Sequence, residues 1–513
     1  MKRYLNLLIL AVLLTRCSDV LEKVPLASVD PATFFETGDN AEAALASAYD
    51  ALQPDTYYGW PMNSIGELPS DNATTGNADV TPLDEINWTS STGVVSNLFR
   101  QAYIGINRAN AIIKYVPGIA DMPAERRDQI VGQAYFLRAL HYFNLVRLYG
   151  GVPLRLEPTE QSEGSTLPRA AEDQVYAQIV ADLQQAESLC GESYGSAELD
   201  RAYATKTVAN ALLTKVYLTT RQWGGAVEAA TKVLASTHYS FTPDFRALFP
   251  IENQLESILE VQYSGTPNDG GNAMPDLMLP SPPASYSFPK FNLPTAEIVG
   301  YADTAATHDK RWTLASRTYV TVADGADANT FPDTTTVIDD HVTIRDYYPY
   351  KSAPGSGSGN DLGYFEFKHL GEANFFNSPL NYVIIRLSDV ILMYAEASNE
   401  LNGPNGDALE KLNMTRNRAG LPALMLADVS SKEALRDAID RERRLELAFE
   451  GERWFDLLRY TKHEAADGSQ HAVTALDLIE QKRGTRNTDF LLFPIPLDEI
   501  NSNPQLGQQN PGF

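Results

Sequence analysis

The stretch IDRERRLELAFEGERWFDLLR, residues 439–459, decides the fold class of this chain. Its charged residues fall three and four positions apart, a spacing that lets opposite charges pair along a helix face. They are Glu442, Arg443, Glu446, Glu450, Arg453 and Asp456. The apolar residues between them supply a core-facing side and include Leu445, Leu447, Ala448, Phe449, Trp454, Phe455 and Leu457. We interpret this stretch as helical and its charge network as structural rather than catalytic.

The same helical periodicity continues on both sides of this stretch. Apolar residues at three- and four-residue spacing predict helices over residues 40–52, 96–116, 124–149, 170–189, 205–219, 223–236, 388–402, 407–419, 432–450 and 453–460. Gly150-Gly151 and the following Val152-Pro153 end the third of these helices. Successive helices rich in Ala and Tyr predict a mostly α fold of degenerate, tetratricopeptide-like helical repeats.

Residues 239–381 differ from the helical regions on either side. They include Pro280-Ser281-Pro282-Pro283, a Gly-Ser run over residues 355–359 and short alternating segments such as residues 363–368. This composition predicts a loop-rich insertion with short strands. Loops held on a rigid scaffold often carry binding sites, so we expect ligand contacts from this region.

The expected organisation is one domain over residues 31–513. It consists of an N-terminal helical part over 31–238, the loop-rich insertion over 239–381 and a C-terminal helical part over 382–513.

The first residues have the features of an export signal. Lys2 and Arg3 precede an apolar run that ends at Leu14 and is too short to span a bilayer. The run leads to Cys17, which we expect to be lipidated after removal of residues 1–16, with residues 17–30 as the lipidated cysteine and its tether. With only one other cysteine, Cys190, a disulfide framework is excluded, and Cys190 is expected to be an inert thiol.

The formal net charge of −25 argues against polyanionic partners. An acidic surface repels phosphate backbones, so nucleic-acid binding is not expected. The same field opposes acidic sugars unless a local basic patch overrides it. A neutral ligand is the simpler expectation.

Several segments together resemble the SusD/RagB family of outer-membrane nutrient-binding lipoproteins of Bacteroidetes. Besides residues 439–459, these are IIRLSDVILMYAEA (384–397), LNMTRNRAGL (412–421), GQAYFLRA (132–139), YGGVPL (149–154), FPIP (493–496) and QNPGF (509–513). Met414 and Thr415 depart slightly from the family pattern. The segments lie in both helical regions and in the family's order.

The resemblance implies a surface-exposed, lipid-anchored protein of the outer membrane. Ser18-Asp19 with Glu22 looks like the acidic signal that sends such lipoproteins to the outer face. Members of the family capture oligosaccharides and pass them to a SusC-like, TonB-dependent β-barrel transporter. That transporter is therefore an expected partner, and the chain is expected not to be an enzyme.

The candidate binding residues follow from the chemistry of sugars, because family members share no fixed ligand motif. Sugar rings stack on aromatic side chains and hydrogen-bond to polar ones. Trp60 and Trp88 are the preferred platforms, with Asp71 and Asn72 as hydrogen-bonding residues. Second choices in the insertion are Tyr286, Phe288, Trp312 and Tyr319, whereas Trp223 and Trp454 fall within helical patterns and are expected in the core.

No enzyme motif stands out. The seven histidines lack zinc-ligand spacing, and residues 355–359 lack a phosphate-binding loop's Lys. No metal site or cofactor is expected, and no EF-hand pattern supports a calcium ion bound in a loop. Two alternatives to glycan capture stay open: a surface glycosidase, which needs only two suitably spaced carboxylates, and capture of peptides or glycopeptides.

Overall fold

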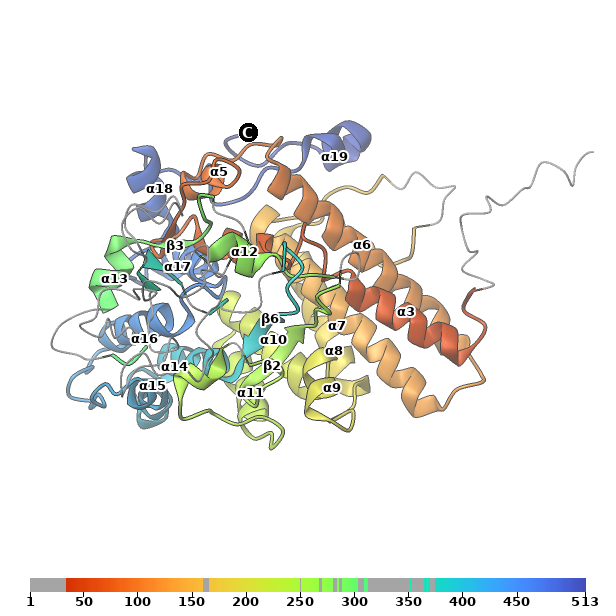
Figure 1. Ribbon diagram of the computed structural model, residues 1–513, viewed down its shortest axis with the longest axis horizontal. Coiled ribbons are helices and arrows are strands. Elements are labelled where there is room, and N and C mark those ends of the chain that lie inside the picture. Colours follow the sequence, from red (N-terminus) through yellow and green to blue (C-terminus); the bar gives the residue numbers. More distant parts are fainter. Residues whose placement is uncertain are drawn as a thin grey trace, which may run out of the picture.

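The computed structural model describes residues 34–159, 166–249, 251–266, 270–279, 284–285, 288–302, 309–311, 350–351, 364–366, 368–369 and 374–513. The predicted lipidation site Cys17 and the candidates Tyr286, Trp312 and Tyr319 lie outside these residues. Helices dominate the described chain, as the sequence predicts (Figure 1).

The N-terminal helices pack on one another in sequence order. They are α3 (Gly38–Asp50), α4 (Pro61–Glu67), α5 (Thr81–Asp84), α6 (Gly93–Tyr115), η1 (Val116–Gly118), α7 (Ala124–Tyr149), α8 (Glu172–Leu189), α9 (Ala197–Ala202), α10 (Lys206–Thr219) and α11 (Trp223–Leu234). Helix α7 contacts both α6 and α8, and α10 contacts both α8 and α11. Each helix therefore buries its apolar stripe against its neighbours, as in helical repeats.

Most of the C-terminal helices lie on the other side of the molecule from the N-terminal bundle (Figure 1). The C-terminal helices are α14 (Leu387–Asn402), α15 (Gly406–Arg418), α16 (Lys432–Leu447), α17 (Arg453–Asp467), α18 (Ala475–Arg483), α19 (Leu497–Ser502) and η4 (Pro504–Leu506). Helices α10 and α11 pack against α14 and so connect the two sides. None of the described helices is both long and apolar enough to cross a membrane.

Local sequence explains where several helices begin and end. The hydroxyls of Thr205 and Ser431 accept the backbone N–H groups of Val208 and Ala434, which caps α10 and α16. Gly468 adopts φ 72° just after α17, a left-handed conformation that glycine tolerates at a helix end. Helix α16 ends at Leu447 rather than at residue 450, because Phe449 (φ 66°) turns the chain toward α17.

Short antiparallel strand pairs lie between the two helical sides. Strand β1 (Ala73–Thr74) pairs with β3 (Leu293–Pro294), β2 (Ser257–Val261) with β6 (Tyr382–Arg386), and β4 (Tyr350–Lys351) with β5 (Tyr364–Phe365). The remaining elements here are η2 (Phe245–Leu248), α12 (Met274–Met278) and α13 (Ala296–Ala302). The prediction of short strands in this region is confirmed for the described residues, whereas the domain boundaries stay a prediction.

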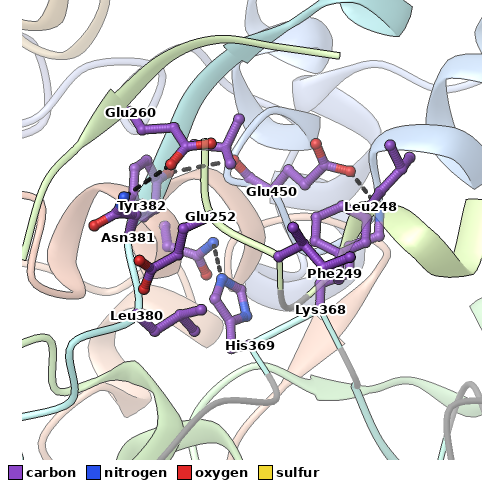
Figure 2. Close-up of a pocket in the computed structure, with 13 residues that line it drawn as sticks. Leu248, Phe249, Glu252, Glu260, Lys368, His369, Leu380, Asn381, Tyr382 and Glu450 are labelled. Carbon is purple, nitrogen blue, oxygen red and sulfur yellow. Dashed lines mark hydrogen bonds and ion pairs between the residues drawn. The ribbon is translucent and has the colours of Figure 1, made fainter. Parts of the chain in front are cut away.

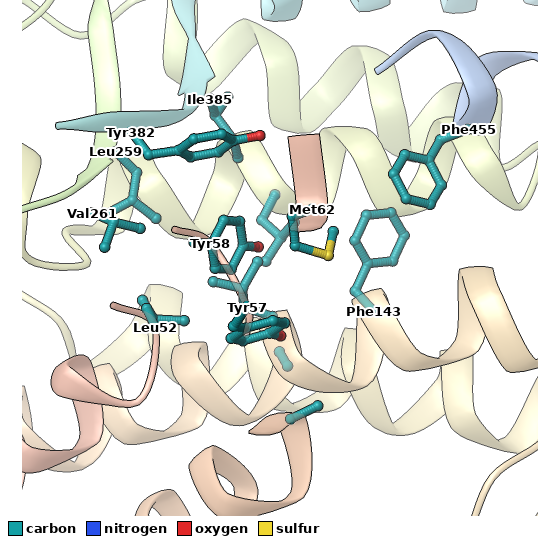
Figure 3. Close-up of a cluster of buried hydrophobic side chains, with 14 of the residues drawn as sticks. Leu52, Tyr57, Tyr58, Met62, Phe143, Leu259, Val261, Tyr382, Ile385 and Phe455 are labelled. Atoms are coloured by element: carbon teal, nitrogen blue, oxygen red, sulfur yellow. The ribbon is translucent and has the colours of Figure 1, made fainter. Parts of the chain in front are cut away.

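One hydrophobic core joins segments from both ends of the chain (Figure 3). The Tyr58 ring lies 4.8 Å from that of Tyr57 and 5.3 Å from that of Tyr382 on β6. The Asn144 amide on α7 donates hydrogen bonds to the hydroxyls of both Tyr57 and Tyr58, so neither phenol is buried without a partner. Trp454 is also buried here, as predicted.

Cys190 lies at the end of α8 and is buried, as expected for an inert thiol. Burial raises the pKa of its thiol to about 12, so the reactive thiolate is scarce at neutral pH.

Candidate functional site

Trp88 is a core residue and not the exposed platform that the sequence analysis predicts. Its side chain is 1% exposed, with ring centroids 4.7 Å from Phe493 and 6.3 Å from Trp454. The segment around Trp88 lacks helical periodicity, which suggested a surface loop. The C-terminal residues that cover the indole are distant in sequence and gave no local signal.

Asp71 is a buried structural ion partner rather than a ligand residue. Both of its carboxylate oxygens accept hydrogen bonds from Arg453, at 2.8 and 3.1 Å, and Arg444 lies 3.3 Å away. Burial alone would raise the pKa of Asp71, but the charges of Arg453 and Arg444 outweigh it and lower the pKa to about 2. The prediction of a solvent-facing hydrogen-bonding residue is therefore wrong for Asp71.

Asn72 is also buried, which corrects its predicted role. Its side-chain oxygen accepts a hydrogen bond from Arg444 at 2.9 Å, and its amide donates to Glu67 at 3.3 Å. The Glu67 carboxylate also accepts the backbone N–H of Gly451 at 2.9 Å. Burial raises the pKa of Glu67 to about 8, although these hydrogen bonds lower it. Residues 67–72 thus form a polar connection to the C-terminal part.

The predicted charge network exists, but most of its pairs connect different elements. Arg443 bridges Asp389 on α14 and Asp456 on α17, and Arg453 bridges Asp71 and Asp440. Glu446 accepts hydrogen bonds from three separated arginines, Arg311, Arg386 and Arg418. Because each ion is buried with several partners, the network specifies how the helices meet.

Trp60 is the predicted platform that stays partly accessible. It lies at the start of α4, half-buried, and its ring meets that of Phe291 edge to face at 5.2 Å. Phe291 in turn donates its backbone N–H to the carbonyl of Leu277 on α12 at 2.9 Å. Trp60 is therefore fixed beside α12, the short helix in the middle of Figure 1.

Three further phenylalanines surround α12, and we call the set the α12 aromatic cluster. Its members are Trp60, Phe288, Phe291, Phe375 and Phe376. The rings of Phe288 and Phe376 lie 6.3 Å apart and both are half-buried, whereas Phe375 is 62% exposed. Both Phe375 and Phe376 adopt positive φ, 50° and 66°, which is uncommon for bulky residues and is found at functional sites.

Asp276 on α12 holds the two loops of this cluster together. Its carboxylate accepts the backbone N–H of Ser285 through one oxygen and that of Phe376 through the other, at 2.7 Å for Phe376. The Ser285 hydroxyl accepts the N–H of Phe375 at 3.1 Å. Since Asp276 is fully buried, these hydrogen bonds fix loops that are about 90 residues apart in sequence.

The cluster also contains a buried cation. The Lys290 ammonium lies 3.9 Å from the centroid of the Phe288 ring and donates to the carbonyl of Asp276 at 2.7 Å. Burial lowers the pKa of Lys290 to about 8, opposed by the charge of Asp276. The ammonium therefore contacts the Phe288 ring through a cation–π interaction.

A separate small cavity lies between β2, β6 and the turn at Glu450 (Figure 2). Its volume of about 40 Å³ suits water rather than a sugar ring. Its polar groups are engaged with one another: Asn381 donates to Glu260 at 2.9 Å, and Lys368 pairs with Glu450. In the described ranges, no group of three or more His, Cys, Asp or Glu residues is arranged to hold a metal ion.

Two family models match most of the chain between them. The SusD family model matches residues 294–513, and a model described as "Starch-binding associating with outer membrane" matches residues 30–218. SusD-like protein P2 of Formosa agariphila is 27% identical over 538 residues, which cover 100% of both chains. A SusD-like protein of Bacteroides ovatus is 25% identical over 88% of this chain and 81% of its own length.

The chain matches the SusD family in both of its halves.

Solved SusD-like structures share its fold. A SusD superfamily protein from Parabacteroides distasonis gives a TM-score of 0.73 at 24% identity, covering 93% of this chain and 99% of that one. A laminarin-binding SusD-like protein gives 0.69 at 24% identity, covering 93% and 100%. Surface glycan-binding protein A from Bacteroides uniformis gives 0.70 at 24% identity, covering 92% and 99%. The predicted mostly helical, tetratricopeptide-like SusD architecture is confirmed.

The sequence analysis missed Phe375 and Phe376. They stand in the segment Asn374-Phe375-Phe376-Asn377-Ser378-Pro379, where adjacent aromatics occur among turn-forming residues without helical period. That composition was available as a signal, because large rings placed in a turn are not needed for helix packing.

Proposed function

We propose that this protein captures neutral oligosaccharides at the α12 aromatic cluster and delivers them to a SusC-like, TonB-dependent transporter of the outer membrane. The proposed binding role rests on partly exposed aromatic rings that buried polar contacts hold in place. These rings are Trp60, Phe288, Phe375 and Phe376. Rings fixed in this way can stack on the apolar faces of sugars with little loss of side-chain freedom.

Relatives support a carbohydrate as the ligand. Two proteins with this fold are a laminarin-binding SusD-like protein and a surface glycan-binding protein, and one matching family model is described as starch-binding. A neutral oligosaccharide also suits a protein of net charge −25, because the acidic surface does not repel it. Tyr286 and Trp312 remain candidates for further contacts.

The cellular role follows from the family and the leader. We propose that Cys17 carries the lipid anchor and that the protein is exposed at the cell surface. The description "associating with outer membrane" supports that location. The SusC-like transporter is proposed as the partner because members of the family share this role.

We further propose that the protein binds its ligand without cleaving it. Glycoside hydrolysis requires a carboxylic acid and a carboxylate on either side of the bond. At the α12 aromatic cluster, the Asp276 carboxylate is fully buried and accepts two backbone N–H groups. It is therefore held as a structural group.

Isothermal titration calorimetry with laminarin, starch, mannan and peptide digests tests the proposal. At least one neutral glycan should bind, and Trp60→Ala and Phe375→Ala should each weaken binding by about tenfold, the loss expected for one stacking contact of 1 to 2 kcal/mol. Phe513→Ala, which removes a partly exposed ring at the C-terminus, is the matched control and should leave affinity unchanged.

Three results would contradict the proposal. Release of reducing ends by the pure protein would favour a glycosidase. Binding restricted to peptides would favour the peptide-capture alternative. Equal affinity of the wild type and the Trp60 and Phe375 variants would place the site elsewhere.

A further inference from the structure

Lys290 is a fully buried cation within the α12 aromatic cluster. Lysine side chains are almost never buried completely, because removing the ammonium from water is costly. An apolar side chain of similar size would fill the same space without that cost. The contacts of Lys290 indicate what its charge does there.

The backbone that carries Lys290 is fixed to the N-terminal part of the chain. The Thr75 hydroxyl donates to the carbonyl of Lys290 at 2.9 Å, and the Asn77 amide donates to the carbonyl of Pro289 at 3.0 Å. Pro289 also restricts the backbone between Phe288 and Lys290, because its ring fixes φ. Phe288 and Lys290 therefore stand at set positions, two residues apart.

The side chain of Lys290 folds back over the ring of Phe288. The ammonium lies 3.9 Å from the ring centroid and donates to the carbonyl of Asp276 on α12 at 2.7 Å. The hydrogen bond sets the place of the ammonium, and the cation attracts one face of the ring. A sugar that stacks on Phe288 therefore has to use the opposite face. The ring of Phe376 lies next to it, 6.3 Å away and tilted by 37°.

Asp276 supplies the charge that acts on Lys290. Burial lowers the pKa of Lys290 to about 8, and the charge of Asp276 opposes this shift. Thr75, which contacts the Lys290 backbone, donates its N–H to Asp84, and that carboxylate pairs with Lys482 at 3.0 Å. The ammonium is therefore charged at neutral pH and loses its proton as the pH rises through about 8.

We infer that Lys290 is a positioning residue of the glycan site, whose positive charge holds the Phe288 ring in the orientation on which the sugar stacks. The inference rests on the proposed function, because it concerns the same site. Since Lys290 is fully buried, it acts through the ring and not through contact with the sugar. Loss of the charge therefore weakens ligand binding although no residue that contacts the sugar has changed.

Calorimetry of the purified protein with laminarin, starch and mannan, at about pH 7 and about pH 9.5, tests this inference. The wild type should bind at least one of these glycans, about fivefold more weakly at the higher pH, as for loss of a cation–π contact. Lys290→Met keeps the length of the side chain without its charge. It should bind about fivefold more weakly than the wild type at the lower pH and lose nothing further at the higher pH.

A double-mutant cycle shows whether Lys290 acts through the ring. In a Phe288→Leu protein, Lys290→Met should have no further effect, because the cation then has no ring to hold. Phe288→Leu alone should also abolish the pH dependence of binding, a measurement that does not depend on the folding of the lysine variant. Lys114→Met is the matched control, since Lys114 lies 5.4 Å from the Tyr115 ring at the end of α6. It should match the wild type at both pH values.

Three results overturn the inference: equal wild-type affinity at the two pH values, wild-type affinity of Lys290→Met at the lower pH, or a pH dependence that persists in Phe288→Leu. Trp60→Ala and Phe375→Ala distinguish this failure from that of the proposed function. If they weaken binding while the lysine variant does not, only the role of Lys290 is wrong. If they leave affinity unchanged, or if none of the three glycans binds, the proposed function is wrong and the role of Lys290 with it.

Discussion

Gly66 on α4 lies directly against the main chain of Gly451, which comes just before α17. A Cβ atom on residue 66 would be 2.0 Å from the Gly451 carbonyl oxygen. Gly66→Ala should therefore force the two segments apart and lower the free energy of unfolding by about 1–3 kcal/mol or more, measured by urea denaturation. Gly224→Ala, in α11 with no atom near its Cβ, is the control and should be neutral or stabilising.

Asp71 should contribute strongly to stability. Asp71→Ala leaves the buried Arg453 and Arg444 without their shared carboxylate and should cost about 3–5 kcal/mol. Asp467→Ala, which breaks the exposed pair with Arg221, should cost at most about 1 kcal/mol. Similar losses for the two variants in thermal denaturation would contradict this prediction.

Acid should remove the contribution of Asp71 to the stability of the fold. The pKa of Asp71 is about 2 in the folded protein and near 3.9 in the unfolded chain. Between these two pH values the folded state therefore binds fewer protons than the unfolded state. The stabilisation is therefore complete above pH ~4 and is lost as the pH falls toward 2. Asp71→Ala should differ least from the wild type at the acid end of that window.

Glu67 should have the opposite pH dependence. Its folded pKa of about 8 exceeds that of the unfolded chain, near 4.3, so the folded state holds the proton more tightly. Stability contributed by this group falls as the pH rises from about 4 to 8. Glu67→Gln keeps the shape without the ionisation and should be more stable than the wild type at pH 9, on the order of a few kcal/mol, but not at pH 5. An unchanged difference between the two proteins across this range would contradict the raised pKa.

Trp88 and Trp60 should respond differently to truncation. Trp88→Ala should cost about 3–5 kcal/mol of stability, because a fully buried indole is removed from contact with Trp454 and Phe493. Trp88→Phe should cost less, since the buried indole N–H has no hydrogen-bond acceptor among the described residues. Trp60→Ala should alter stability less than Trp88→Ala and act mainly on ligand affinity. A Tm loss for Trp60→Ala as large as that for Trp88→Ala would identify Trp60 as a core residue.

Much of the fold could be predicted because helical periodicity is local. The pattern around Leu445 and Trp454 identifies α16 and the start of α17, although α17 continues to Asp467 instead of ending at residue 460. The failure at the end of α16 reflects one positive φ at Phe449. The partners of Asp71 and Trp88 could not be predicted in this way, because they come from the other end of the chain. Polar and aromatic residues in an aperiodic segment look the same whether they face solvent or a distant helix.

The hydrogen bonds of Glu67 to Gly451 and of Asp71 to Arg453 also constrain how the chain folds. Both carboxylates are synthesised early, whereas these two partners lie near the C-terminus and are synthesised late. Long-range pairing of this kind raises contact order and slows folding. A long loop must close, with a loss of chain entropy, before the contact can form. A nascent chain stopped before residue 451 lacks the Gly451 N–H and the Arg453 guanidinium, so residues 67–72 gain these partners only when α17 has emerged.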